Sequence, residues 1–193
     1  MMENSLGHAS SPRACPMAFS LNLRADHAPS ITALWDEVAR FEDVGSMRAL
    51  GYAPHFTFAI YDDDAVSETM ARRAMERAAV GETMVSVAFR TIRTFAGPPL
   101  VVWAEPDPCQ ALARMHAAIH QTIDPTLCRS HYRPGAWVAH CTLGTRIQDE
   151  RRAHATAFAE GFRGGIEARF DTLDCVMFPP LRIVTDKRLP SAS

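Results

Sequence analysis

The order of the elements predicted along this chain constrains its fold most, because the same order occurs twice. The spacing of apolar residues predicts strand, helix, strand, helix and strand, and the series begins again near residue 99, with a period of about 82 to 85 residues. The two copies share almost no residue identity, so the pattern alone carries the repeat. We expect an α/β (α+β) fold with two pseudo-symmetric βαβαβ lobes and mostly antiparallel sheets around a central cleft.

The boundaries of the expected elements come from the periodicity and from capping residues. Ser30 is the expected N-cap of the first helix, and Asp107, followed by Pro108, that of a later helix. A change of apolar phase at 171–173 indicates a β-bulge. Strands are expected at 18–24, 54–61, 83–95, 100–104, 136–146, from 166 onward and at 181–185, and helices at 30–42, 65–79, 107–123 and from 149 to the Gly164-Gly165 pair.

These elements predict one bilobal domain over 18–186, with lobe-forming repeats at about 18–98 and 99–186. Residues 1–17 are rich in Ser, Ala and polar side chains and are expected to form a flexible tail, as are 187–193. The N-terminal segment lacks the apolar centre of a signal peptide, and no apolar stretch approaches the length of a membrane span. We therefore expect a cytoplasmic monomer that does not enter a membrane.

The charge and cysteine content exclude several classes of protein. Lys+Arg 20 against Asp+Glu 22 gives a net charge of -2, so no overall basic field favours long duplex nucleic acid. The cysteines are odd in number and contain no Cys-x-x-Cys pair, which argues against a disulfide framework and against a thiolate zinc site. They lie at Cys15, Cys109, Cys128, Cys141 and Cys175.

Two short motifs occupy corresponding places in the two copies. The first is His55-Phe56-Thr57-Phe58 and the second, eighty-five residues later, is His140-Cys141-Thr142-Leu143. Side chains alternate between the faces of a strand, so each histidine shares a face with its threonine while the two apolar residues face the other side. Two imidazoles and two hydroxyls that converge on one cleft are suited to phosphoryl chemistry.

At these motifs the chain resembles the two-histidine (2H) phosphoesterase superfamily, which includes 2'-5' RNA ligase-like proteins and cyclic phosphodiesterases. The resemblance covers 19–185 and is carried by the two His-x-Thr motifs and their separation. Trp137-Val138-Ala139 before the second histidine and Leu143-Gly144 after its threonine fit the family pattern well. Two departures concern the substrate class: Ala139 stands where a proline often occurs, and Arg146 falls one residue later than the arginine of many members.

The resemblance implies an enzyme that opens a 2',3'-cyclic phosphate, or reversibly joins 2'-5' RNA ends, without a metal or other cofactor. Two imidazoles can hold opposite protonation states near neutral pH, so one can act as a base and the other as an acid. The resemblance assigns His140 as the base toward water and His55 as the acid toward the leaving oxygen, although the roles could be exchanged. Thr57 and Thr142 would donate hydrogen bonds to phosphoryl oxygens.

Four further residues are candidates for substrate binding. Tyr61 shares the strand face of His55, and Arg146 shares that of Thr142, where it could neutralise a phosphate. Tyr132 and Arg133, in the loop before the second motif, could contact a base or sugar. Each also has an ordinary structural interpretation as a packed or solvated residue.

One pair of histidines suggests a metal site instead. His116 and His120 are four residues apart on a predicted helix, a spacing that metal ligands use. The helix lacks the Glu after the first histidine that a zinc protease would carry, and both rings lie beside its apolar stripe. We therefore predict that both are packed, hydrogen-bonded residues, and that Asp62-Asp63-Asp64 is a solvated turn.

Three functions remain open on the sequence. The first is the phosphoesterase described above, acting on a small phosphodiester or an RNA terminus. The second is the same chemistry on a nucleotide-sugar cyclic phosphate, which the mild acidity of the chain favours. The third is an RNA- or nucleotide-binding protein that has kept the cleft and lost turnover.

Overall fold

A computed structural model describes residues 17–62 and 65–191, so the expected N-terminal tail lies almost entirely outside the described residues, as do Asp63 and Asp64. The strands are β1 (Ala18–Arg24), β2 (His55–Asp62), β3 (Val85–Phe95), β4 (Leu100–Pro106), β5 (Cys141–Ile147), β6 (Ile166–Phe170), β7 (Thr172–Phe178) and β8 (Arg182–Arg188). The α-helices are α1 (Pro29–Ala39), α2 (Ser46–Ala49), α3 (Glu68–Ala78), α4 (Gln110–Thr122) and α5 (Arg152–Gly161).

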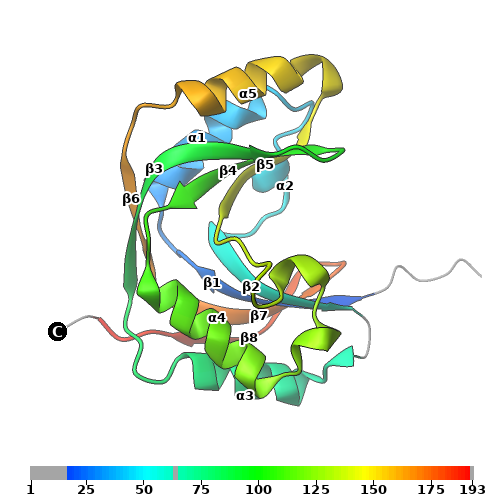
Figure 1. The fold of residues 1–193 in the computed structure, drawn as a ribbon, viewed down its shortest axis with the longest axis vertical. Coiled ribbons are helices and arrows are strands. Elements are labelled where there is room, and N and C mark those ends of the chain that lie inside the picture. Colours follow the sequence, from blue (N-terminus) through cyan, green and yellow to red (C-terminus); the bar gives the residue numbers. More distant parts are fainter. Residues whose placement is uncertain (1–16, 63–64, 192–193) are drawn as a thin grey trace, which may run out of the picture.

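All eight strands belong to one antiparallel sheet in the order β6-β3-β4-β5-β2-β1-β7-β8 (Figure 1). This confirms the α+β class and its antiparallel pairing. The order is consistent with a pseudo-two-fold axis between β5 and β2, because β4 and β1, the first strands of the two copies, lie at equal distances from that centre. The two strands that carry the motifs are therefore neighbours at the middle of the sheet.

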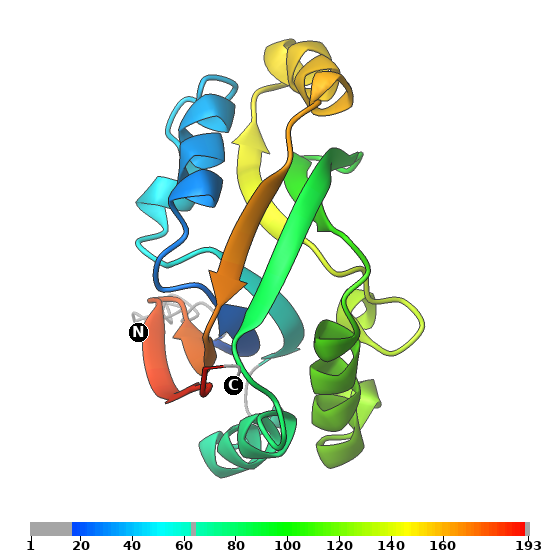
Figure 2. The same cartoon turned by 90° about the vertical axis from the view of Figure 1, so that its left-hand side faces the viewer.

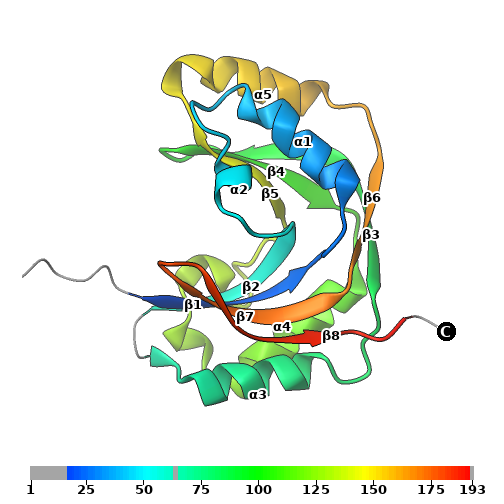
Figure 3. The ribbon, with the colours of Figure 1, turned by 180° about the vertical axis from the view of Figure 1, so that it is seen from behind.

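The sheet bends into two arms, and each arm uses both halves of the chain. Helices α1 and α5 cover the arm of β4 and β5, whereas α3 and α4 cover the arm of β1, β2, β7 and β8 (Figures 1 and 3). The first-half helix α1 packs on β5 and β6, and the second-half helix α4 packs on β2. Each of the expected repeats, 18–98 and 99–186, thus places at least one of its helices on a strand of the other repeat.

Strands β3 and β6 join the arms. Figure 2 shows β3 and β6 side by side along the length of the molecule, and they are paired over 85–89 and 166–170. The expected β-bulge at 171–173 is a change of partner instead: β6 pairs with β3, Asp171 interrupts the strand, and β7 then pairs with β1 and β8. Leu173 thus enters the core of the other arm, which explains the shift of apolar phase.

The expected helix caps are wrong in both cases. Helix α1 begins at Pro29 after Ala28, and the Ser30 hydroxyl instead donates to the carbonyl of Glu167. Helix α4 begins after Cys109, and the Asp107 carboxylate accepts a hydrogen bond from Arg90 at 2.9 Å instead of capping the helix. At the C-terminal end, β8 continues into the expected tail, where Leu189 is buried.

Glu42 attaches the segment after α1 to β5. Its carboxylate is buried and accepts hydrogen bonds from the backbone N–H groups of Ser46, Thr145 and Arg146 and from the Ser46 hydroxyl, at 2.7 to 2.9 Å. Four donors satisfy the buried charge without a cation. This places α2 beside the end of the second motif. No helix in the described ranges is long and apolar enough to cross a membrane.

Gly144, on β5, lies against Val38 of α1 and against Glu42, which follows α1. A Cβ atom there would lie 2.6 Å from Val38 Cγ1 and 3.2 Å from Glu42 Oε1. We expect Gly144→Ala to lower the free energy of unfolding by about 1 to 3 kcal/mol through overpacking, as measured by denaturant titration. Gly161→Ala is the control, since nothing lies within 4 Å of its Cβ position. Equal stability of the two variants would contradict this packing.

Candidate active site

The two His-x-Thr motifs meet where β2 and β5 touch. His55 is the first residue of β2, whereas β5 begins at Cys141, so His140 ends the preceding loop rather than lying in the expected strand 136–146. The two strands share the residue pair Phe56 and Cys141, both fully buried. Because side chains alternate along a strand, the residues on either side of this pair face away from the core. The structure thus brings His55, Thr57, His140 and Thr142 together.

These four side chains line one cleft of about 590 Å³. Its polar lining also includes Ser20, Ser46, Tyr52, Tyr132, Thr145 and Arg146. Its apolar lining includes Met47, Leu50, Ile60, Val176, Phe178 and Leu181. A cleft with one guanidinium and an apolar wall can accept an anionic group attached to a flat or apolar body.

Both imidazoles are held in the same tautomer. Nδ1 of His55 lies 2.8 Å from the carbonyl of Ala53, and Nδ1 of His140 lies 2.8 Å from the carbonyl of Val138. A carbonyl only accepts, so each ring must carry its proton on Nδ1 when neutral. Nε2 of each ring is then the nitrogen available to a ligand.

The surroundings of the two rings favour their neutral forms. Burial of the ring, reinforced by the nearby His140, lowers the pKa of His55 to about 4. Burial likewise lowers the pKa of His140, which packs edge-on against Phe95 and Trp103. Both changes have the sign expected when a cationic ring loses water. An anion in the cleft would act in the opposite direction.

The two threonines differ in their hydrogen bonds. The Thr57 hydroxyl donates to Oδ1 of Asn22 at 3.0 Å. Among the described residues, the Thr142 hydroxyl has no protein partner, although it lines the same cleft. The motifs therefore match in backbone position and differ in what each hydroxyl can offer a ligand.

Two tryptophans cross between the halves of the chain and bind the backbone of these threonines. Trp35, on α1, donates its indole N–H to the carbonyl of Thr142 at 3.0 Å. Trp137, in the loop before β5, donates to the carbonyl of Thr57 at 2.9 Å. Sequence reasoning did not single out these contacts, because they follow from the crossing of the chain.

The four predicted binding residues divide into two pairs. Tyr132 and Arg146 line the cleft, as expected. Tyr61 instead lies fully buried in the core, and Arg133 donates to the carbonyls of Cys128 and Thr126 within its own loop. Tyr61 changes face because Phe58 is an extra residue opposite β1, and such a bulge reverses the alternation that follows it.

Comparisons with known proteins identify the family. The family model described as the 2'-5' RNA ligase superfamily matches residues 26–177. The chain belongs to the 2'-5' RNA ligase superfamily. The resemblance to the two-histidine phosphoesterases is thereby confirmed. No curated protein gives a significant match.

Solved structures share the fold of this superfamily member at low identity. Escherichia coli LigT complexed with NADP+ matches with a TM-score of 0.58 and 10% identity over 92% of this chain and 100% of that chain. LigT complexed with 3'-AMP matches with a TM-score of 0.55 and 12% identity over 90% of this chain and 98% of that chain. Kluyveromyces marxianus Usb1 matches with a TM-score of 0.54 and 12% identity over 90% of this chain and 97% of that chain.

In this member of the 2'-5' RNA ligase superfamily, His116 and His120 bond the backbone of Tyr132, a residue that lines the cleft. Nε2 of each ring bonds the carbonyl of Tyr132, at 2.8 and 3.0 Å, and His116 stacks on Trp137. Both nitrogens therefore act as donors to one oxygen. Within 17–62 and 65–191, no group of three or more His, Cys, Asp or Glu side chains is arranged to hold a metal.

The tautomers and pKa values can be measured by ¹⁵N NMR of the imidazoles. We expect both rings to be Nδ1–H and neutral at pH 7, with titration midpoints below about 6.5, the ordinary imidazole value. Phosphate should raise both midpoints, because an anion favours the protonated ring. His55→Ala and His140→Ala assign the signals. An Nε2–H tautomer or a midpoint above the ordinary value would contradict the geometry.

Proposed function

We propose that this chain is a metal-independent phosphoesterase that opens a 2',3'-cyclic phosphate, or joins 2'-5' RNA ends in the reverse direction. The observation that carries the proposal is the pair of histidines that line one cleft. Nδ1 of each ring is bonded to the backbone carbonyl two residues before it, which leaves Nε2 free for a ligand. Membership of the 2'-5' RNA ligase superfamily supports phosphoester chemistry.

The proposed mechanism moves one proton at each side of the phosphorus. One Nε2 takes a proton from water as the water oxygen bonds to phosphorus, and the other Nε2 gives a proton to the ribose oxygen as its bond to phosphorus breaks. The carbonyls of Ala53 and Val138 keep their Nδ1–H bonds throughout, and they stabilise whichever ring is cationic. The two rings exchange protonation states in one turnover, and proton exchange with the solvent restores them before the next turnover.

The pKa values bear on which histidine is the base. The resemblance assigns His140 to this role and His55 to that of the acid. Burial lowers the pKa of both rings, and that of His55 to about 4, so both rings favour the neutral form that a base requires. The exchanged assignment, with His55 as the base and His140 as the acid, therefore stays an alternative, which the choice of leaving group decides.

The surrounding residues suit a small anionic substrate. Arg146 is the guanidinium of the cleft lining, and the Thr142 hydroxyl can donate to a phosphoryl oxygen. Tyr132 and the apolar wall can receive a base or sugar. The similar LigT structures hold 3'-AMP and NADP+, which supports a nucleotide-sized ligand here. We further propose that the protein is a monomer and that it acts in the cytoplasm. The second proposal is supported by Cys109, Cys128, Cys141 and Cys175, which are free thiols.

A nucleotide-sugar cyclic phosphate is the second candidate substrate, because the NADP+ complex shows that a similar fold accepts an extended dinucleotide. Turnover should be compared for 2',3'-cyclic mononucleotides, ADP-ribose cyclic phosphate and oligoribonucleotides. Faster turnover of the cyclic mononucleotides or the oligoribonucleotides supports the main proposal. Faster turnover of ADP-ribose cyclic phosphate supports the alternative. Tight binding without turnover across this panel would indicate a silent binding protein.

The general acid and base should be separable by leaving group. We expect His55→Ala and His140→Ala each to lower kcat by about 10² to 10⁴ on a cyclic phosphate, without unfolding the protein. On bis(4-nitrophenyl) phosphate, whose leaving group needs no proton, the variant that lacks the acid should recover most of its rate. Buffers with and without EDTA test for a metal. Full activity of either alanine variant on the cyclic phosphate would refute the mechanism.

The pH dependence should follow the lowered pKa values. A lowered pKa lets the base stay neutral at lower pH, and it makes the acid lose its proton at lower pH, so both limbs move toward acid. We expect a bell-shaped profile of kcat/KM with its maximum below about pH 6.5. A maximum at alkaline pH, or a profile with one limb, would contradict two-histidine catalysis in this environment.

A further inference from the structure

A buried amide lies directly behind Thr57. Asn22, on β1, pairs with Thr57 across the sheet and is 1% exposed. Its Oδ1 accepts the Thr57 hydroxyl at 3.0 Å, and its Nδ2 donates to Ser20 Oγ at 3.0 Å and to Asp174 Oδ1 at 3.1 Å. The amide is thus bonded at both ends.

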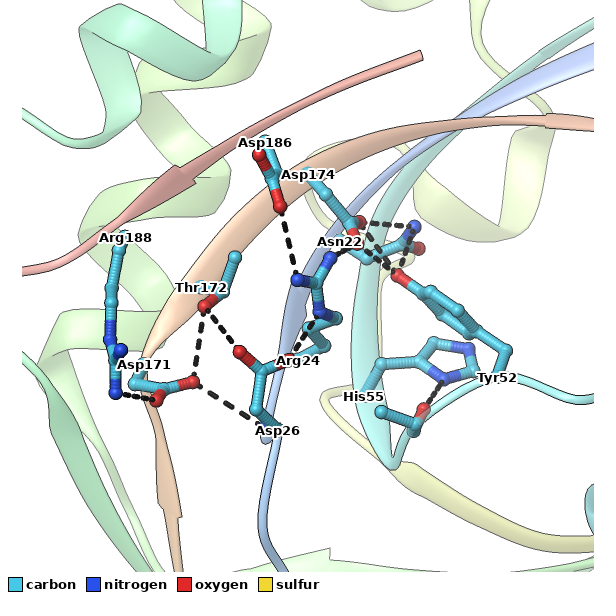
Figure 4. Close-up of polar contacts among 11 residues, drawn as sticks. Asn22, Arg24, Asp26, Tyr52, His55, Asp171, Thr172, Asp174, Asp186 and Arg188 are labelled. Carbon is cyan, nitrogen blue, oxygen red and sulfur yellow. Dashed lines mark hydrogen bonds and ion pairs between the residues drawn. The ribbon is translucent and has the colours of Figure 1, made fainter. Parts of the chain in front are cut away.

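The rest of the network determines which way this amide points. Asp174 is 0% exposed, and its carboxylate accepts from Arg24 Nη1 at 2.7 Å and from the Tyr52 hydroxyl at 2.6 Å (Figure 4). Burial and the Asp174 charge raise the pKa of Tyr52, so the phenol keeps the proton that it donates. Burial raises the pKa of Asp174, whereas the Arg24 guanidinium at 2.7 Å favours its ionised form. An ionised carboxylate only accepts, so Asn22 turns Nδ2 toward Asp174 and Oδ1 toward Thr57.

This orientation limits what Thr57 can offer a ligand. A hydroxyl has one proton, and that of Thr57 is directed at Asn22 Oδ1. The oxygen therefore presents lone pairs to the cleft. A phosphoryl oxygen carries negative charge and requires a donor, which Thr57 can supply only by breaking its bond to Asn22.

The second motif has no corresponding acceptor. The residue that pairs with Thr142 across the sheet, as Asn22 does with Thr57, is Trp103 on β4. An indole has a donor and no acceptor, and the buried Trp103 Nε1 has no hydrogen-bond partner in the described structure. The Thr142 proton therefore remains available to the cleft.

The same network also holds His55. The ring of Tyr52 packs against that of His55, with centroids 4.7 Å apart, while its hydroxyl bonds Asp174. Figure 4 shows Asn22, Tyr52 and Asp174 joined beside His55, with Arg24 on the far side of the carboxylate. Thr57 and His55 are thus anchored to one buried carboxylate.

We propose that Asn22 is a positioning residue that gives the two threonines different roles: it holds the Thr57 proton away from the phosphate, and Thr142 alone supplies the hydroxyl donor. This inference rests on the proposed phosphoesterase function and deepens it. It replaces the equal roles that the paired motifs suggest.

The first test compares the threonines on a 2',3'-cyclic mononucleotide. We expect Thr142→Val to lower kcat by about 100-fold, the effect of losing one donor to the transition state. Thr57→Val should lower kcat by about three- to tenfold, because it loses an anchoring hydrogen bond only. An equal or larger loss for Thr57→Val would overturn the proposal.

The second test shows whether Asn22 acts through Thr57. Asn22→Ala should lower the Kd for inorganic phosphate by about three- to tenfold, because the freed Thr57 hydroxyl becomes a second donor, and it should have less than about a twofold effect when Thr57 is already Val. Asp174 keeps Arg24 and Tyr52 as partners in this variant, so we expect it to fold; thermal unfolding checks this. An undiminished effect of Asn22→Ala in the Thr57→Val background would refute the positioning role.

Binding of inorganic phosphate, measured by calorimetry, separates this inference from the proposed function. Thr142→Val should raise the Kd for phosphate by about three- to tenfold, and Thr57→Val by less than about twofold. If the wild-type protein binds phosphate but turns over no cyclic phosphate, the proposed function fails while the binding comparison still decides the threonine roles. A wild-type protein that neither binds phosphate nor turns over substrate would overturn both.

Discussion

The contact between β2 and β5 is the constraint on which the rest of the structure depends. The two strands share the pair Phe56 and Cys141 and then belong to different arms of the sheet. At this contact the arms must be joined by side chains, and the indole N–H groups of Trp35 and Trp137 bond the backbone carbonyls of Thr142 and Thr57. Each tryptophan comes from the opposite half of the chain. The crossing of the chain between the arms therefore also fixes the positions of the two threonines in the cleft.

The buried ion pair of Arg24 and Asp174, beside the cleft, has a large unfavourable free energy of desolvation. Both side chains are largely removed from water, and such a pair offsets its desolvation only when the remaining polar atoms are bonded. Here Tyr52 and Asn22 also donate hydrogen bonds to the Asp174 carboxylate. The remaining N–H groups of the Arg24 guanidinium donate to Asp26 and Asp186. The result is a fixed orientation of polar groups behind His55 and Thr57. An apolar cluster of equal volume could stabilise the fold but could not orient an amide.

The pseudo-symmetry of the backbone does not extend to the side chains. Asn22 and Trp103 hold corresponding positions beside the two threonines, one as an acceptor and the other without any acceptor. The environments of the histidines differ accordingly, since His55 packs on Tyr52 and His140 on two aromatic edges. Two strands in corresponding places of the sheet therefore give the two imidazoles different surroundings.

Local pattern was sufficient for much of the fold and for the centre of the site. Alternation along the strands determined that Phe56 faces the core while His55 and Thr57 face the cleft, because side-chain direction in a strand depends only on position. The sequence alone also determined the α+β class and the superfamily. Local pattern left Tyr61 and Arg133 open between substrate binding and a structural role. The bulge at Phe58 that turns Tyr61 into the core depends on the pairing of β2 with β1, and the conformation of its own loop bonds Arg133 to Cys128 and Thr126.

Only the tertiary structure decided how the two halves combine. The crossing of α1 and α4 between the arms, the change of partner at Asp171 and the donation from Thr57 to Asn22 join residues that are far apart in the chain. No periodicity records such contacts, because packing across the whole sheet selects them. The sequence therefore determined which histidines and threonines line the cleft, and the fold decided what each of them can donate or accept.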